Sequence, residues 1–167
     1  NNPNCPEIET IYEEELLETG GAVKNAKDLL GNKPIFTLNT DVILHSERNI
    51  FEDMIKKWDA RKMDFLLLMQ PYKNTVGYVG HGDFDLNFEG KLHRPDKAEN
   101  YSYMYAGLQI LKPELVAKHP LRIFSLREYY LNSKRVTGVK AKEVHWYHAT
   151  TPEDIISIEM DMISNFS

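Results

Sequence analysis

The sequence predicts an α/β protein in which helices cover both faces of a largely parallel sheet. Short apolar runs near 35–38 and 64–70 alternate with helix-like patterns over 22–30 and 47–61. Strands that alternate with helices in this way are typical of βαβ units. The unbroken apolar run within 64–70 also indicates a strand that is buried on both faces. A chain of 167 residues is long enough for one sizeable core, so we expect a single domain over 1–167.

The first half of the chain follows this alternation element by element. A polar–apolar alternation predicts the opening strand, and apolar residues at helical spacing predict the helices. Gly31 is expected to end the first helix and Ser46 to cap the second. The expected elements are a strand over 7–12, a helix over 22–30, a buried strand from Lys33 toward Asp41, a helix over 47–61 and a strand over 64–70.

In the second half of the chain, the regular alternation of strands and helices gives way to shorter segments. Short segments separated by turn residues over 76–93 predict a hairpin or meander. A longer strand over 103–111 contains Gly107, and a glycine inside a strand marks a bulge or a close backbone approach. The remaining expected elements are a helical turn at 113–116, a short helix opened by a Ser125–Glu128 capping box, strands over 136–141 and 144–147, and a last helix capped by Thr151 that buries Ile155, Ile156, Met160 and Ile163.

Composition limits the classes of partner. The net charge is −5, which argues against nucleic acid, because its binders normally present a basic face. No apolar run is long enough to cross a bilayer, so we expect no membrane partner. The single cysteine, Cys5, rules out an internal disulfide and fits a reducing compartment, so a cytoplasmic location is expected.

The strand that ends at Asp41 carries the first candidate for chemistry. In open α/β sheets, ligands bind at the carboxyl ends of the strands. Asn39, Thr40 and Asp41 follow the apolar run directly, so this carboxylate can hold a metal or lie near a phosphate. Taken alone, the strand favours a carboxylate that only caps a turn, and the rest of the chain decides between the two roles.

Two further clusters contain candidate groups. Gly20 and Gly21 precede a helix, where glycine N–H groups can approach an anion, although such a pair can also make a simple tight turn. His148 follows a strand and precedes a capped helix, where it can be a ligand or merely pack against its aromatic neighbours. The sequence has no zinc-like Cys/His spacing, nucleophile elbow or Walker A loop.

In this order, the clusters resemble those of the sugar-1-phosphate nucleotidyltransferases. The subgroup that they resemble most comprises the bacterial mannose-1-phosphate guanylyltransferase-like and N-acetylmuramate 1-phosphate uridylyltransferase-like proteins. The resemblance runs from about Glu7 to the last helix. It rests on Leu17-Glu-Thr-Gly-Gly21 with the Asn-x-Asp-Val strand end, Tyr105-Ala-Gly-Leu-Gln-Ile-Leu-Lys-Pro-Glu-Leu115, Phe124-Ser-Leu126 and Trp146-Tyr-His-Ala-Thr-Thr-Pro-Glu-Asp154.

The resemblance implies a fold and a reaction. The fold is a Rossmann-like three-layer α/β/α arrangement, similar to GT-A. The reaction joins a nucleoside triphosphate to a sugar 1-phosphate and releases pyrophosphate. Such transfer depends on positioning and on charge neutralisation by Mg²⁺ at the phosphates.

The resemblance also implies roles for individual residues. Asp41 is the expected catalytic, Mg²⁺-binding aspartate. Arg94 stands near a family Lys-Pro pair on the sugar-phosphate side, although it can equally be a solvated surface residue. The remaining implied contacts are Glu18, Thr19, Gly20, Gly21 and Asn39 on the nucleotide side, and Gly77 and Gly107 on the sugar-phosphate side.

Two departures from the family pattern affect these expectations. His148 stands where the family has a second metal-binding aspartate, and Mg²⁺ prefers oxygen ligands. Either Asp41 and the substrate phosphates hold the metal, or Mn²⁺ serves, or His148 donates to a phosphate. Thr150 replaces a family glycine in the same segment.

The second departure is that the family's opening segment, a Gly-rich loop with an Arg and then a Pro-Lys pair, is absent. We therefore expect the C-terminal portion of a fold that is incomplete at its N-terminal side, with a sheet edge that self-association or a missing N-terminal half would cover. Three functions stay open: a nucleotidyltransferase that is inactive if the triphosphate cradle is lost, a GT-A-type glycosyltransferase, and a non-catalytic module that binds sugar phosphate or nucleotide. Asn39-Thr40-Asp41 in place of Asp-x-Asp argues against the glycosyltransferase.

Overall fold

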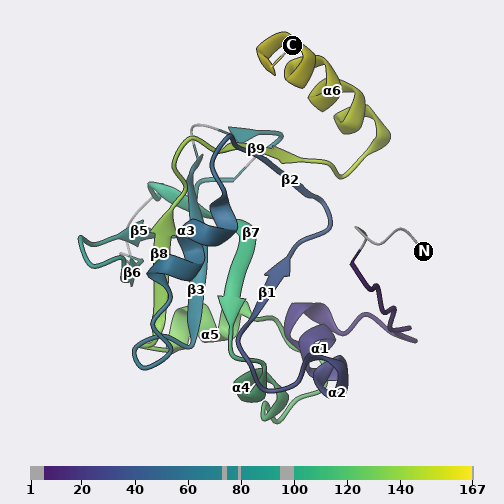
Figure 1. Ribbon diagram of the computed structural model, residues 1–167, viewed down its shortest axis with the longest axis vertical. Coiled ribbons are helices and arrows are strands. Elements are labelled where there is room, and N and C mark those ends of the chain that lie inside the picture. The colour runs from purple at the N-terminus through teal and green to yellow at the C-terminus, as the bar shows by residue number, and fades with distance from the viewer. Residues whose placement is uncertain (1–5, 73–74, 79, 95–99, 167) are drawn as a thin grey trace.

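The centre of the protein is a four-stranded mixed sheet with the order β1-β7-β3-β8 (Figure 1). The computed structural model describes residues 6–72, 75–78, 80–94 and 100–166, so Cys5 lies outside the described residues. β7 runs antiparallel to β1 and to β3, whereas β3 and β8 are parallel. The predicted α/β sheet is confirmed, with one antiparallel strand that the sequence pattern did not indicate. The strands are β1 (Ile35–Leu38), β3 (Phe65–Pro71), β7 (Tyr103–Leu111) and β8 (Val136–Lys140).

Helices cover both faces of this sheet and give it three layers. Successive side chains of a strand point to opposite faces. Leu66 and Leu68 of β3 therefore share one core with Met54 of α3, whereas Phe65 and Leu67 belong to a second core beneath α4 and α5. One unbroken apolar run thus supplies two cores. The helices on the two faces are α3 (Ile50–Lys57) and, opposite it, α4 (Pro113–Ala117) and α5 (Arg127–Asn132) (Figure 1).

Two smaller sheets complete the described strands. One has the order β2-β9-β4, and the other is a β5-β6 hairpin. The β5–β6 hairpin confirms the first alternative of the predicted hairpin or meander, whereas β4 pairs in parallel with β9. In the first sheet, Val42 of β2 lies opposite His148 of β9, so the strand that follows Asp41 meets a segment far along the chain. The strands are β2 (Val42–His45), β4 (Thr75–Val76), β5 (Asp85–Leu86), β6 (Leu92–His93) and β9 (His145–His148).

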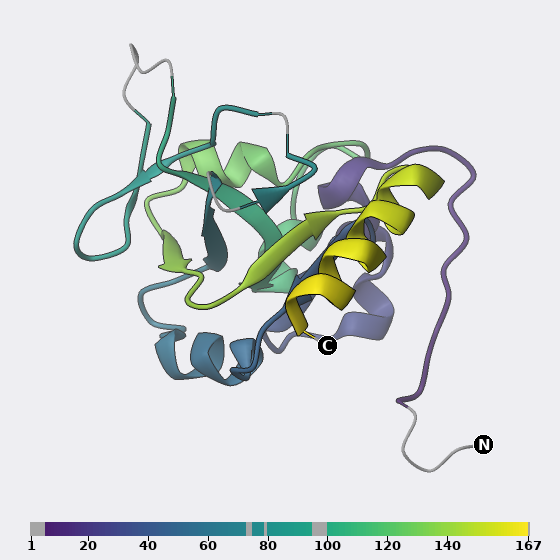
Figure 2. The same ribbon diagram turned by 90° about the horizontal axis from the view of Figure 1, so that it is seen from above.

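The predicted strand over 7–12 is wrong. These residues form no described secondary structure, and Ile8 and Tyr12 are exposed. Figures 1 and 2 show this segment on the outside of the molecule, away from the sheet. A polar–apolar alternation becomes a strand only when a partner supplies hydrogen bonds and one face is buried, and neither condition holds here.

The helices begin and end at positions other than those predicted. The helix expected over 22–30 is two helices, α1 (Glu18–Asn25) and α2 (Lys27–Leu30), and the glycine pair lies inside the first turn of α1. Asn49, rather than Ser46, caps α3, because its side-chain oxygen accepts a hydrogen bond from the N–H of Glu52 at 3.1 Å.

The Ser125–Glu128 capping box does not form. Ser125 Oγ accepts from the N–H of Arg127 at 3.2 Å, whereas the carboxylate of Glu128 lies 3.4 Å from His119 Nε2. Because His119 packs beside this helix, Glu128 finds a partner there instead of turning back toward Ser125.

The last helix, α6 (Pro152–Phe166), begins as predicted but is packed differently. Thr151 Oγ1 accepts from the N–H of Asp154, and Asp154 accepts in return from the N–H of Thr151. The expected burial of Ile155, Ile156, Met160 and Ile163 is wrong, because all four are exposed. Ile158 is the buried residue of a helix that extends away from the sheet (Figure 1). None of the described helices is long and apolar enough to span a membrane.

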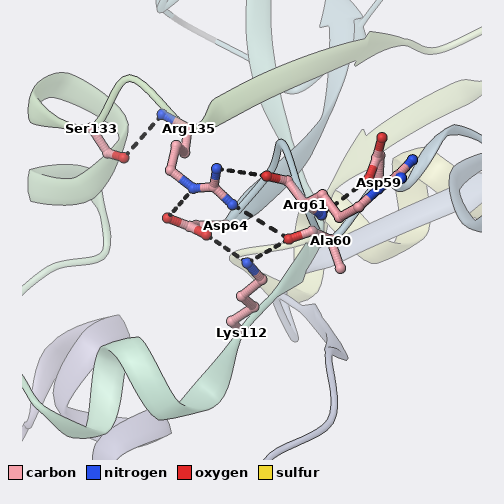
Figure 3. A network of polar contacts seen from close by, with 7 residues as sticks. All are labelled: Asp59, Ala60, Arg61, Asp64, Lys112, Ser133 and Arg135. Carbon is pink, nitrogen blue, oxygen red and sulfur yellow. Dashed lines mark hydrogen bonds and ion pairs between the residues drawn. The ribbon is translucent and has the colours of Figure 1, made fainter.

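An ion-pair network ties three neighbouring strands of the central sheet together (Figure 3). Asp64, just before β3, accepts from Lys112 Nζ at 2.7 Å and from Arg135 Nε at 2.9 Å. Lys112 follows β7 and Arg135 precedes β8, so one carboxylate joins the ends of all three strands. The same two cations also donate to the carbonyl oxygens of Ala60 and Arg61.

The charge of Asp64 should contribute to stability in a pH-dependent way. Partial burial raises the pKa of Asp64, but the hydrogen bonds and charges of Lys112 and Arg135 together lower it further, so the net pKa lies below its ordinary value. A lowered pKa in the folded state means that the stabilisation is present above the unfolded-state pKa and is lost as the pH falls through the folded-state pKa.

We expect Asp64→Asn to lower the free energy of unfolding at neutral pH by about 1–3 kcal/mol, since Lys112 and Arg135 lose a charged partner. The difference from the wild type should shrink as the pH falls below about 4, the ordinary pKa of aspartate. Urea unfolding at several pH values measures both effects. Asp59→Asn is the control, because Asp59 pairs mainly with the exposed Arg61 and its loss should matter less. An equal effect of the two variants would contradict the role of Asp64.

Candidate functional site

The candidate site lies where two chain segments share one edge of β7. β1 pairs with this edge as far as Leu108, and the N–H of Asn39 then donates to the carbonyl of Gly107 at 3.0 Å. Beyond that point β1 leaves the edge, and Phe84 bridges to the same strand at Tyr103. A crevice therefore opens at the carboxyl end of β1, the position at which α/β sheets bind ligands.

A cavity of about 640 Å³ occupies this crevice. Of the predicted site residues, Thr19, Asn39 and Asp41 line it. Its other walls come from α1, from the segment at 83–84, from β7 and from the start of α5. The cavity is therefore built from segments that are far apart in the sequence and that meet only in the fold.

Asp41 and His148 lie together at this site. His148 Nε2 is 3.1 Å from Asp41 Oδ2, although the two residues are 107 positions apart. The pairing of β2 with β9 places them side by side, and the N–H of Ala149 donates to the carbonyl of Asp41 at 2.9 Å. Both side chains are partly exposed, so a ligand can reach them.

Of the two side chains Asp41 and His148, only one is a ligand that Mg²⁺ prefers. Mg²⁺ prefers an octahedron of oxygen ligands, many of them water or substrate phosphate oxygens. The carboxylate of Asp41 fits that chemistry, whereas the imidazole of His148 does not. The described residues contain no cluster of three or more His, Cys, Asp or Glu side chains that could hold a metal. The further ligands of a Mg²⁺ ion at Asp41 would therefore have to come from substrate and solvent.

Two of the predicted glycines pack directly against these residues. Gly107 has φ +82°, and a Cβ on it would lie 3.0 Å from Val42 Cγ2 and 3.3 Å from Asn39 Cβ. Gly77 has φ +83°, and a Cβ on it would lie 3.1 Å from the carbonyl oxygen of His148. Both glycines thus allow the backbone to pack closely against residues of the site. A direct contact of either with a sugar stays a prediction.

The pair Gly20 and Gly21 joins α1 to the loop before α5. Both N–H groups donate to the carbonyl of Phe124, at 2.9 and 3.2 Å. A Cβ on Gly20 would lie 2.2 Å from the Phe124 ring, so only glycine allows this approach. Thr19 Oγ1 adds a hydrogen bond from the N–H of Leu126 at 3.0 Å. The N–H groups of the glycine pair are used within the chain, and their contact with a nucleotide stays a prediction.

The two remaining predicted residues lie outside the cavity wall. Glu18 is exposed at the start of α1 and has φ +62°, an unusual backbone conformation for a residue other than glycine. Arg94 Nε donates to the hydroxyl of Tyr101 at 3.2 Å, and its guanidinium lies 5.2 Å from the centre of the Tyr101 ring. Arg94 is exposed, and its contact with a sugar phosphate stays a prediction beside the surface alternative.

The sequence did not single out the polar floor and far wall of the cavity. On the floor, Tyr130 donates to Gln109 Oε1 at 2.9 Å. Burial raises the pKa of the Tyr105 and Tyr130 hydroxyls well above their ordinary value, so both stay protonated at neutral pH. On the far wall, Asp83 pairs with Arg127. Gln109 was the one available signal, because it is a polar residue inside an apolar strand.

One curated relative carries the comparison by sequence. N-acetylmuramate alpha-1-phosphate uridylyltransferase from Caulobacter vibrioides is 33% identical to the chain over 149 residues. By this match the chain is similar to the sugar-1-phosphate nucleotidyltransferases. The match covers 87% of the chain but 61% of the relative, so the chain spans about three fifths of that protein's length. No family model matches the chain.

Several solved structures share the fold of the chain. HddC from Yersinia pseudotuberculosis, complexed with GMP-PN, matches with a TM-score of 0.68 at 18% identity, over 91% of the chain and 65% of HddC. The inositol-1-phosphate CTP transferase from T. maritima matches with a TM-score of 0.66 at 11% identity, over 89% and 62%. A putative glucose-1-phosphate thymidylyltransferase from Bacillus anthracis, in complex with a sucrose, gives 0.65 at 14%, over 93% and 65%. These matches confirm the predicted fold of the family.

We expect Gly107→Ala to disturb the site as well as the stability of the protein. A positive φ makes alanine strained here, at about 1–3 kcal/mol, and the new methyl group also crowds Asn39 and Val42. Urea unfolding measures the first effect, and amide resonances of residues 39–42 report the second. Gly31→Ala is the control, because its φ is +65° but a Cβ there would meet no atom within 4 Å. Unchanged resonances at 39–42 in Gly107→Ala would contradict the supporting role of this glycine.

Proposed function

We propose that this chain carries out nucleotidyl transfer, joining a nucleoside triphosphate to a sugar 1-phosphate with release of pyrophosphate. The observation that carries the proposal is the position of Asp41, at the carboxyl end of β1 beside a cavity of about 640 Å³. The similarity to a uridylyltransferase supports it.

In the proposed reaction, an oxygen of the sugar phosphate attacks the α-phosphorus of the triphosphate, and pyrophosphate leaves in line. Mg²⁺, or Mn²⁺ in its place, would neutralise charge on the phosphates. Asp41 is proposed to hold that ion through its carboxylate. His148 contacts the same carboxylate at 3.1 Å and so restricts its orientation. Gln109 and Tyr130 offer neutral polar groups that suit sugar hydroxyls.

The remaining predicted contacts stay proposals of the same kind. Glu18, Thr19, Gly20, Gly21 and Asn39 are proposed for the nucleotide side, and Gly77 and Gly107 for the sugar side. The relative acts on N-acetylmuramate 1-phosphate as a uridylyltransferase, so UTP with that sugar is the first pair to test, and GTP with mannose 1-phosphate is the second. A cytoplasmic location is proposed from the single Cys5.

Partners that cover the exposed surfaces are proposed as well. β1 pairs with one neighbour in the described sheet, and the apolar side chains of α6 are exposed. A second copy of the chain, or another polypeptide, would cover such surfaces.

One observation favours a second candidate, a module that binds sugar phosphate without turnover. Within the described residues, Asp41 and His148 have no third metal-ligating side chain beside them. A site with a single carboxylate can hold a phosphorylated sugar through an ion without positioning a triphosphate for attack. Ligand-induced stabilisation without pyrophosphate release would support this candidate.

The direct test incubates the chain with nucleoside triphosphates, sugar 1-phosphates and Mg²⁺ and follows pyrophosphate release. We expect Asp41→Asn to reduce the rate by at least about 100-fold, equivalent to roughly 2.7 kcal/mol of barrier. Asp53→Asn is the matched control, because Asp53 is an exposed aspartate paired with Arg48 outside the cavity. Turnover with unchanged metal dependence in Asp41→Asn would exclude the assigned role. Sugar transfer from a nucleotide-sugar would indicate a glycosyltransferase instead.

We expect His148→Asp to tighten Mg²⁺ binding, because it places a second carboxylate beside Asp41. Calorimetric titration with Mg²⁺ and with Mn²⁺ measures the change, and the gain should be larger for Mg²⁺. His45→Asp is the control, since His45 lies at the far end of the same pair of strands, opposite His145. An Mg²⁺ affinity that His148→Asp leaves unchanged would show that the ion does not bind at this pair.

A further inference from the structure

The last helix carries an apolar stripe on its outer face. Ile156 and Met160 are four residues apart, so they lie on one face of α6, and Ile163 continues that face. Ile156 is 54% exposed and Met160 is 65% exposed. Ile158, on the opposite face, is 3% exposed. The stripe therefore points away from the side on which α6 packs, and the helix extends away from the central sheet (Figure 1).

The charges of α6 are all negative. The helix contains four acidic residues and no lysine or arginine. Glu153 and Glu159 lie on either side of the apolar stripe, and both are exposed. Because apolar surface of this kind marks an interaction site, a partner for this face needs an apolar groove with a positively charged rim.

The chain has an apolar groove on the α3 face of the central sheet, which we call the α3–β8 groove. It is a cavity of about 290 Å³ between α3, β3 and β8. Its floor includes Met54, Leu68 and Val139, which belong to the core on this face of the sheet. The described linings of this groove and of the cavity at Asp41 share no residue, so the two are separate.

The rim of the α3–β8 groove is positively charged. Asp53 is the one anion in its described lining and is already paired with Arg48 at 2.9 Å. Lys57, Lys140 and Lys142 are exposed, and no carboxylate of the described residues forms an ion pair with them. The cations of the lining are Arg48, Lys56, Lys57, Lys140 and Lys142.

Helix and groove also match in length. The stripe from Ile156 to Ile163 spans about 10 Å of helix axis, and α3, which walls the groove, has eight residues and spans about 12 Å. A helix that lays its apolar face into an apolar groove is a recurrent mode of recognition. Within one copy, α6 is held elsewhere, because the Tyr147 hydroxyl donates to Asp161 at 2.8 Å. The groove can therefore receive this helix from a second copy.

We infer that two copies of this chain associate reciprocally, with Ile156 and Met160 of each copy entering the α3–β8 groove of the other. Glu153 and Glu159 of the incoming helix then face the lysines of the rim. A closed two-fold pair makes this contact twice, and two-fold pairs are the commonest homo-oligomers. The inference does not depend on the proposed reaction, because neither surface lines the cavity at Asp41.

Sedimentation velocity of the full chain tests the inference. We expect the wild type to form a dimer within about 1–100 µM, and the dimer should weaken as added salt screens the charges. Met160→Glu should weaken association at least about 10-fold, because it places a charge in the apolar stripe, and the double variant Lys57→Glu with Lys142→Glu should do the same by reversing the rim. All three residues are exposed, so both proteins should fold, which circular dichroism checks.

Two matched controls should associate like the wild type. Ile155→Glu changes another exposed isoleucine of α6 that lies about 100° around the helix from Ile156. Lys27→Glu reverses an exposed lysine of α2, outside the lining of the groove.

Mixing the two defective proteins identifies the surfaces that meet. The Met160→Glu copy keeps an intact groove, and the double lysine variant keeps an intact α6. An equal mixture should therefore contain more dimer than either protein alone. A mixture without added dimer would overturn the inference, because it would mean that like surfaces meet. A wild type that is monomeric at about 100 µM, or a dimer that both defective proteins retain, would overturn it as well, and the proposed reaction would stand.

Discussion

The shared edge of β7 is the constraint on which the rest of this protein depends. A strand edge can pair continuously with one neighbour, but here β1 leaves it after Leu108, and Asp83 and Phe84 take it up near Tyr103. Gly107, at φ +82°, stands where β1 departs and lets Val42 and Asn39 approach closely. Where β1 no longer pairs with β7, Asn39 and Asp83 make the hydrogen bonds to the β7 backbone instead. Both residues also line the cavity.

The electrostatics of the cavity follow from this arrangement. Asp41 and Asp83 stand on the two sides of the gap. The carbonyl of Asp41 accepts from the N–H of Ala149, and Asp83 is held by backbone contacts to Tyr103 and Tyr105 of β7. His148 contacts Asp41 across the β2–β9 pairing, and Arg127, at the start of α5, pairs with Asp83. Between them the floor is neutral, because a tyrosine hydroxyl is protonated at neutral pH and burial raises the pKa of Tyr130 further. Charged side chains thus lie at two places in the cavity, Asp41 on one side and the Asp83–Arg127 pair on the other. This arrangement suits a ligand with a phosphate at one end.

The sequence predicts those features that depend on local pattern. The run at 65–69 is apolar on both faces, and β3 indeed feeds two cores. Three further features depend on local sequence and were predicted: the close backbone approach at Gly107, the helix cap at Thr151 and the end of a strand at Asp41. The segment at 7–12 shows where such prediction fails. Its polar–apolar alternation forms a strand only beside a pairing strand, and the local sequence does not show whether one is present. Asp83 and Arg127 are 44 positions apart and each looks like an ordinary surface charge until the fold joins them. The apolar spacing of α6 likewise predicts a helix correctly, but whether its apolar face is buried depends on a neighbouring segment.

The central claim is that the crevice at the carboxyl end of β1 holds a metal and a sugar phosphate at Asp41. Paramagnetic broadening of amide resonances by Mn²⁺, added together with N-acetylmuramate 1-phosphate, tests this most directly. The account predicts selective broadening at residues 39–42 and 147–149, with residues 48–57 around α3 unaffected, and loss of the broadening in Asp41→Asn. Broadening centred on another part of the chain, or broadening that survives in Asp41→Asn, would contradict it.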